Sequence, residues 1–218
     1  TIAAQSLPGV LMPPRLLLGA AAATSLLAAI LMLSQRSLKR LLVLSTVEDA
    51  GFLLLGVASA TQLGLQGAVV AACTHALAKT LLFAGLSAPE RAGELEGAPV
   101  ALATRYPVSA FGFLFGMLAM LGVPPLLGFV GRWRLYETAL QIGWPMAATF
   151  ILSSILALIA YVLALTRFWW GPPRGKEPPD PKAKREPFLL QATIVGLTML
   201  LVLAGIWPGL LQMLQGGR

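Results

Sequence analysis

The sequence contains several runs of about 20 residues without a charged side chain, and these runs constrain the fold more than any other feature. Residues 16–34 form one such run. An α-helix needs about 20 apolar residues to cross a hydrocarbon core of roughly 30 Å. Only 11% of the 218 residues are charged, whereas about 25% are charged in a typical soluble domain, and the mean hydropathy is +0.78. These features exclude a soluble globular domain and predict an all-α, polytopic membrane protein.

The apolar runs predict about six transmembrane spans within a single membrane domain that covers residues 1–218. Five spans are expected to be continuous, at residues 16–34, 41–60, 66–88, 140–166 and 188–214. The sixth, residues 107–139, would reach roughly 50 Å at 1.5 Å per residue, which is too long for one straight crossing. Pro124 and Pro125 lie within it and remove two backbone donors, so we expect a discontinuous helix that breaks at Pro124-Pro125.

The distribution of lysine and arginine predicts the orientation. Residues 89–105 are expected to form a polar loop, and residues 171–187, with six prolines, an extended aqueous loop. Eleven basic residues lie in the loops on one side of the membrane, and at most four lie on the other. Because cytoplasmic loops carry an excess of lysine and arginine, we expect the basic loops to be cytoplasmic and both termini to lie outside.

Composition also limits the cofactors and partners. The formal net charge of +7 would be compatible with nucleic-acid binding in a soluble protein, but in a membrane protein such an excess belongs to the loops, so we expect no nucleic acid. Cys73 is the single cysteine and His75 the single histidine. This count excludes a disulfide framework, an iron–sulfur cluster and a zinc cluster. We therefore expect neither a metal nor a cofactor, and no redox centre in this chain.

Two ionisable residues, His75 and Lys79, interrupt the predicted span at residues 66–88. A charge in a bilayer costs between about 2.5 and 17 kcal/mol, depending on the method, so such residues mark ion pathways. The two are four residues apart and project from one face of a helix. They predict a proton relay, because histidine titrates near neutrality. In the alternative, Lys79 extends to the membrane surface and His75 bonds to a neighbouring helix.

Glu48 and Asp49 lie about two turns into the predicted span at residues 41–60. Adjacent residues on a helix point about 100° apart, so we expect at most one of them to face a given channel axis. Two interpretations stay open at this stage. The acids either belong to a proton path or pair with the basic residues at the start of the span, Arg36, Lys39 and Arg40.

Arg132 follows closely on the Pro124-Pro125 break. A broken helix is tolerated at membrane depth only where it lines a cavity or is buried in protein, and transporters build ion sites in this way. Alternatively, Arg132 anchors the helix at the membrane surface beside Trp133 and Tyr136. The sequence leaves both interpretations open.

Several strings resemble the antiporter-like proton-translocating subunits of respiratory complex I, membrane-bound hydrogenases and multisubunit cation/proton antiporters. They are SLKRLL from Ser37, LSTV from Leu44, THALAKTLLF from Thr74, GVPP from Gly122 and GFVGR from Gly128. The strings occur in the order and at the spacing of that family. They cover about residues 15–170.

The resemblance implies an architecture of two inverted five-helix repeats, each with one broken helix. Residues 15–170 match the second repeat and residues 188–214 the final helix, so the first repeat is missing, either because the sequence is partial or because the chain is a shortened relative. Lys79 and His75 match the central lysine and histidine. Arg132 occupies the broken-helix position, which is usually lysine and sometimes glutamate in the family. Arginine cannot be deprotonated in a protein, so at this position it can act only as a fixed field.

The resemblance implies a proton-translocating membrane-arm subunit of a redox-driven complex, similar to an NADH–quinone oxidoreductase (NADH dehydrogenase) or a hydrogenase. Protons would move along Glu48, Asp49, His75, Lys79 and Arg132. Expected partners are other membrane-arm subunits and the lipid bilayer, in a bacterial or archaeal plasma membrane or a mitochondrial inner membrane. Two alternatives are a subunit of a cation/proton antiporter without redox coupling and a shortened structural subunit that conducts nothing.

Overall fold

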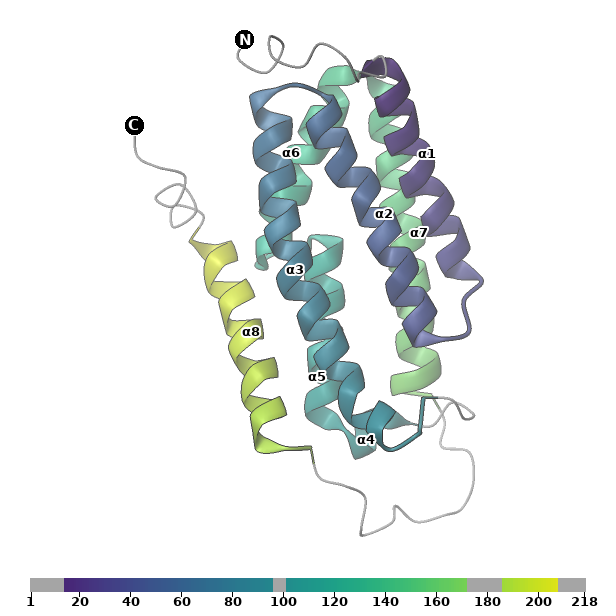
Figure 1. Cartoon of the computed structure of the whole chain (residues 1–218), viewed down its shortest axis with the longest axis vertical. Helices are drawn as coiled ribbons and strands as arrows, with labels where there is room; N and C mark the ends of the chain where they lie inside the picture. The colour runs from purple at the N-terminus through teal and green to yellow at the C-terminus, as the bar shows by residue number, and fades with distance from the viewer. Residues whose placement is uncertain (1–13, 96–100, 172–185, 208–218) are drawn as a thin grey trace, which may run out of the picture.

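The computed structural model describes residues 14–95, 101–171 and 186–207, and within these ranges every regular element is helical. Figure 1 shows the helices as one bundle. In chain order they are α1 (Pro14–Leu33), α2 (Leu38–Ala58), α3 (Gln62–Arg91), the short α4 (Leu102–Arg105), α5 (Pro107–Leu121), α6 (Leu127–Ile142), α7 (Trp144–Ala164), the π-helical turn η1 (Leu165–Trp169) and α8 (Phe188–Ile206).

Five helical segments are long and apolar enough to cross a membrane, namely α1, α2, α3, α7 with η1, and α8. Helices α5 and α6 have 15 and 16 residues, so each is only about 23 Å long and neither crosses a core of roughly 30 Å alone. They follow one another along the 30-residue α3 (Figure 1). The structure therefore confirms the predicted all-α polytopic bundle with one discontinuous helix.

The break between α5 and α6 is built by a glycine and two prolines. Helix α5 ends at Leu121, and Gly122 follows with φ 72°, a left-handed conformation that glycine adopts without strain. The amide of Gly122 bonds to the carbonyl of Ala119 at 3.2 Å. Pro124 and Pro125, joined by a cis peptide bond, cannot donate to a helical ladder. The chain is therefore unable to resume a helix until Leu127.

Several predicted boundaries were wrong; for example, residues 102–105 of the predicted loop form α4, and α3 begins at Gln62 instead of residue 66. Helix α3 continues through Pro89 to Arg91, so residues 89–91 are not loop. Shortly after its end, Gly93 has φ 73°, a left-handed conformation that commonly terminates helices. Residues 140–142 belong to α6, since Gly143, with φ 152°, separates α6 from α7. The predicted loop at residues 171–187 lies outside the described residues except at its ends, as does the end of the predicted last helix, residues 208–214.

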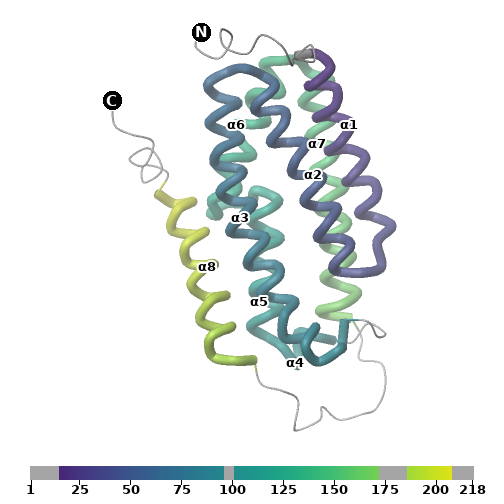
Figure 2. The backbone as a smooth tube through the Cα atoms, viewed as in Figure 1, coloured from purple at the N-terminus to yellow at the C-terminus, as the bar shows by residue number. Residues whose placement is uncertain are grey.

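The helices form two groups, which pack on either side of the broken helix α5–α6. Helices α1, α2 and α7 pack together on one flank, and α8 lies on the other against α3, α5 and α6 (Figures 1 and 2). One apolar cluster, which includes Phe52, Leu135 and Phe150, joins α2, α6 and α7. Many large apolar side chains on the outer faces of α7 and α8 are exposed, as expected where helices face lipid.

Candidate functional site

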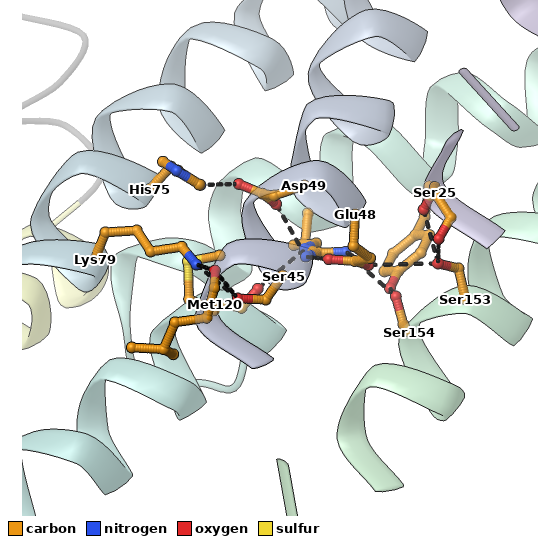
Figure 3. A network of polar contacts seen from close by, with 12 residues as sticks. Ser25, Ser45, Glu48, Asp49, His75, Lys79, Met120, Ser153 and Ser154 are labelled. Carbon is orange, nitrogen blue, oxygen red and sulfur yellow. Dashed lines mark hydrogen bonds and ion pairs between the residues drawn. The ribbon is translucent and has the colours of Figure 1, made fainter. Parts of the chain in front are cut away.

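The ionisable residues singled out by the sequence are buried at the level of the helix break, between α2, α3, α6 and α7 (Figure 3). Glu48 is ten residues into α2, which places it about 15 Å from the start of the helix, near the middle of a bilayer. Glu48, Asp49, Arg132 and Lys79 are between 2% and 7% exposed. The side chain of His75 is 21% exposed. The burial of four charges at this depth defines the candidate site.

Arg132 binds both acidic residues of α2. Its Nη1 donates to Oε1 of Glu48 at 3.2 Å and its Nη2 to Oε2 at 3.1 Å, which makes a bidentate pair. Nη2 also donates to Oδ1 of Asp49 at 3.0 Å. The guanidinium carbon lies 3.8 Å from the centre of the Phe52 ring, which makes a cation–π contact.

Arg132 also stabilises the helix break. Its Nε donates to the carbonyl oxygen of Met120 at 3.1 Å. Met120 lies in the last turn of α5, where carbonyls have no partner within the helix and where the helix dipole favours a cation. Nη1 further donates to Oγ of Ser154 at 3.4 Å. All five N–H groups of Arg132 thus have acceptors, so the side chain holds α2, α5, α6 and α7 together.

Asp49 connects the arginine to the histidine. Its Oδ2 lies 2.7 Å from Nδ1 of His75, while Oδ1 accepts from Arg132. The four groups therefore form a continuous line in the order His75, Asp49, Arg132, Glu48. Beside this line is a small pocket with room for about one water molecule, lined by Asp49, Ala71, Thr74, His75, Ala119, Met120, Gly128 and Arg132.

Lys79 lies next to this line and has separate partners. Its Nζ donates to Oγ of Ser45 at 2.6 Å and to the carbonyl oxygen of Leu42. With His75 neutral, the two positive charges of Lys79 and Arg132 balance the two carboxylates. In the alternative interpretation, Lys79 extends to the membrane surface. The structure contradicts this, because the amine of Lys79 turns inward onto α2.

The structure gives the acids other partners than one of the two open interpretations proposed, and it brings both acids to one group. Glu48 and Asp49 do not pair with the basic residues at the start of α2; their partner Arg132 comes from α6, and Lys39 pairs with Glu90 at 2.6 Å instead. Both acids reach one group, although we expected at most one to face a given axis. The reason is that the planar fork of a guanidinium presents donors in two directions, so it spans the 100° between adjacent side chains.

Sequence reasoning missed the hydroxyl groups of the site. Ser153 donates to Oε1 of Glu48 at 3.5 Å and lies 2.7 Å from the hydroxyl of Ser25, while Tyr136 lies 2.6 Å from Ser154 (Figure 3). Serines are common in apolar helices, where they can bond to their own backbone. Their sequence positions alone therefore gave no signal.

Among the residues that the structure describes, no three His, Cys, Asp or Glu side chains are grouped closely enough to hold a metal ion. Asp49 and His75 have one another and Arg132 as partners. The site is therefore one of buried charges and hydroxyls.

Comparison with known proteins gives the chain a family. Residues 13–159 match the model of the family described as NADH:quinone oxidoreductase/Mrp antiporter, TM. The NADH-quinone oxidoreductase subunit N of Desulforudis audaxviator is 33% identical over 191 residues, which make up 84% of this chain and 38% of the relative. The chain thus spans less than two fifths of the length of that relative.

Two solved structures share the fold. A chain of the Mrp complex from Dietzia sp. DQ12-45-1b superposes with a TM-score of 0.80 at 21% identity, covering 91% of this chain and 45% of that one. A chain of respiratory complex I from Thermus thermophilus superposes with a TM-score of 0.70 at 28% identity, covering 91% and 44%. Because the family model matches well over half of its residues, the chain is an integral membrane protein that belongs to the NADH:quinone oxidoreductase/Mrp antiporter family.

Proposed function

We propose that this chain carries protons through the membrane as part of a redox-driven complex, similar to complex I or a membrane-bound hydrogenase. The observation that carries the proposal is the line of His75, Asp49, Arg132 and Glu48 beside Lys79, buried at the middle of the bundle. Groups of this kind in a membrane are costly and mark ion pathways. In such a complex, electrons would move in a partner subunit.

In this proposal, His75 within the line and Lys79 beside it are the groups that exchange protons. A proton on His75 adds a positive charge four residues from Lys79, and like charges repel, so protonation of one group favours proton release from the other. Asp49 accepts the hydrogen bond from the imidazole and fixes the ring. Arg132 keeps its proton and supplies a constant field.

The placement of this chain in a larger protein is also part of the proposal. Residues 15–170 would be the second five-helix repeat of an antiporter-like subunit and residues 188–214 its final helix, with the basic loops, including that at residues 171–187, on the cytoplasmic side and the termini outside. This agrees with the match to somewhat less than half of the Mrp and complex I chains. The partners would be other membrane-arm subunits, since both of those structures are complexes.

Two other functions have a specific observation in their favour. A cation/proton antiporter subunit without redox coupling is favoured by the likeness to the Mrp complex in fold. A structural subunit that conducts nothing is favoured by Arg132, whose five N–H groups are all bonded and which cannot release a proton. Purification of the native assembly separates the first two functions, because a redox-driven complex contains a flavin or iron–sulfur subunit and an antiporter does not.

Substitution of Lys79 tests the proposal against the non-conducting alternative. In the native assembly reconstituted in vesicles, Lys79→Ala is expected to lower proton flux by at least about tenfold, the effect of a barrier raised by 1.4 kcal/mol. The matched control is Lys39→Ala, which removes a lysine paired with Glu90 at the surface. Equal flux in wild type and Lys79→Ala, with normal assembly of both, would contradict proton transport through this site.

A further inference from the structure

Helix α8 contacts the broken helix at three points along its length (Figure 1). Glu186, immediately before α8, accepts hydrogen bonds from two backbone amides in the first turn of α5, at 2.7 and 3.2 Å. Ile194, which is fully buried, packs against Gly112 in the middle of α5. Gly205, in the last turn of α8, lies against the break that follows α5. One helix thus contacts the start of α5, its middle and the break.

The contact at the break requires a residue without a side chain. A Cβ atom at Gly205 would overlap the carbonyl oxygen of Pro125 and would lie 2.6 Å from the amide nitrogen of Leu127. Both are backbone atoms, which cannot rotate away as the end of a side chain can. A Cβ atom at Gly196 of the same helix would meet nothing within 4 Å. Glycine in a helix costs roughly 0.5–1 kcal/mol relative to alanine, and the close approach of two backbones gives this cost a reason at Gly205.

The break is held by groups on both of its sides. Its own backbone has few hydrogen bonds to offer, because the two prolines do not donate. Arg132 binds the break from the side of α2, through the carbonyl oxygen of Met120 at 3.1 Å. Helix α8 lies on the other side (Figure 1), and Leu126 and Leu127 at the break are each 2% exposed. The break is therefore enclosed between the arginine and α8.

The position of the break determines the surroundings of His75. Ala119 and Met120 before the break and Gly128 after it line the small pocket that Asp49 and His75 also line. The Met120 carbonyl binds the arginine that pairs with Asp49. A displacement of the break therefore changes both the shape of this pocket and the placement of the positive charge beside Asp49.

We propose that α8 is a clamp that fixes the helix break relative to the charge cluster, with Gly205 as a positioning residue for His75 and Arg132. The clamp consists of the three contacts made by Glu186, Ile194 and Gly205. A movement of α8 reaches the break because the contact at Gly205 joins two backbones, and it reaches the cluster because Arg132 binds the break. The clamp follows from packing and goes beyond the proposed proton transport, so either proposal can fail without the other.

Nuclear magnetic resonance of the His75 imidazole tests the clamp in the full chain, prepared with isotopically labelled histidine in mixed micelles. The His75 signals are those lost in His75→Gln. Gly205→Ala is expected to shift the Nδ1 signal, because the displaced break moves Arg132. This arginine shares Asp49 with the imidazole. The matched control Gly196→Ala adds the same methyl group to the same helix in open space and is expected to keep the wild-type signal, whereas a role of Gly205 in stability alone would lower the free energy of unfolding without moving the signal.

A pair of substitutions provides a second test if Gly205→Ala does not assemble. A Cβ atom at Gly112 would lie 2.9 Å from Cγ2 of Ile194, and a β-branched side chain in a helix has little freedom to move away. Gly112→Ala should therefore displace α8 and shift the His75 signal. In the double variant with Ile194→Ala, the new methyl group occupies space that the isoleucine leaves, so the signal should return toward its wild-type position. A signal that stays displaced in the double variant would show that position 112 acts without α8, and the clamp would be wrong.

The outcomes separate the clamp from the proposed transport. The clamp is wrong if the His75 signal of Gly205→Ala stays at its wild-type position, or if Gly196→Ala shifts the signal equally. If the signal shifts in Gly205→Ala alone while Lys79→Ala keeps full proton flux in vesicles, the clamp stands and proton transport through this site fails. If the signal stays in place while Lys79→Ala abolishes flux, proton transport stands and the clamp fails.

Discussion

Replacement of Arg132 by methionine gives the most direct test of the buried charge cluster. Methionine has a similar length and fills much of the same space, but it cannot donate hydrogen bonds. The change leaves the carboxylates of Glu48 and Asp49, 2% and 4% exposed, without their shared cation. It also leaves the carbonyl oxygen of Met120 at the end of α5 without its donor.

The expected loss of stability follows from these contacts. Removal of one partner from a buried ion pair costs about 3–5 kcal/mol, because the remaining charge is left uncompensated. Loss of the hydrogen bond to the Met120 carbonyl adds about 1 kcal/mol. Asp49 keeps its hydrogen bond with His75, which offsets part of this cost. We therefore expect Arg132→Met to lower the free energy of unfolding by about 4 kcal/mol at neutral pH.

The assay is reversible unfolding of the purified protein in mixed micelles, followed by tryptophan fluorescence. The control is Arg134→Met, which removes a neighbouring arginine on α6 that makes no ion pair with a described residue; a loss below about 1 kcal/mol is expected. A double-mutant cycle with Glu48→Gln should give a coupling energy of about 1–3 kcal/mol between Arg132 and Glu48. The loss should also shrink as pH falls, because a protonated carboxyl group needs no counter-charge.

Two results would refute this reasoning. If Arg132→Met and Arg134→Met lower stability equally, the buried ion pairs do not hold the bundle together. The second result is a double-mutant cycle that gives no coupling energy between Arg132 and Glu48. In that case the bidentate pair at 3.1 and 3.2 Å contributes nothing to stability, and Arg132 stabilises only the helix break, through the carbonyl oxygen of Met120.

Two further predictions concern the packing that positions the site. A Cβ atom at Gly128 would overlap the carbonyl oxygen of Ala119 across the break, so Gly128→Ala should lower the free energy of unfolding by at least about 2 kcal/mol, whereas Gly19→Ala, where the new atom meets nothing within 4 Å, should leave it unchanged or raise it by up to about 1 kcal/mol; equal effects in micelle unfolding would contradict the packing. Glu186 accepts from the backbone amide of Ser109 at 2.7 Å, at the first turn of α5, so Glu186→Gln should cost about 1 kcal/mol in the same assay, and an unchanged value would show that this cap does not stabilise the helix.

The parts of the site that the sequence predicts are those that depend on one helix. Lys79 and His75 stand out because each interrupts an apolar run, and the break stands out because two adjacent prolines remove two donors. These signals are local, so they can be recognised in the sequence without knowledge of the tertiary fold. The same holds for the number of spans, which depends on length and hydropathy alone.

The parts that the sequence does not predict depend on contacts between helices. Arg132 and its partner Glu48 are 84 residues apart, so the sequence marks Arg132 by its place after the break but does not show which acidic residue it binds. The serines that bind Glu48 and Lys79 resemble any serine in an apolar helix. Helix ends were also misplaced, since α3 continues through Pro89 and ends shortly before the left-handed Gly93.

Arg132 has two effects that a lysine at the same position could not combine. Its guanidinium satisfies two carboxylates, a helix-terminal carbonyl and a serine hydroxyl at once, whereas an ammonium has three donors at one point. The broken helix is thus held more firmly, but the group that holds it cannot lose a proton. In the proposed pathway, proton movement would therefore depend on His75 and Lys79, whose hydrogen-bond partners are Asp49 and Ser45. The substitution of a fixed charge for a titratable one moves the proposed chemistry from the break to α3.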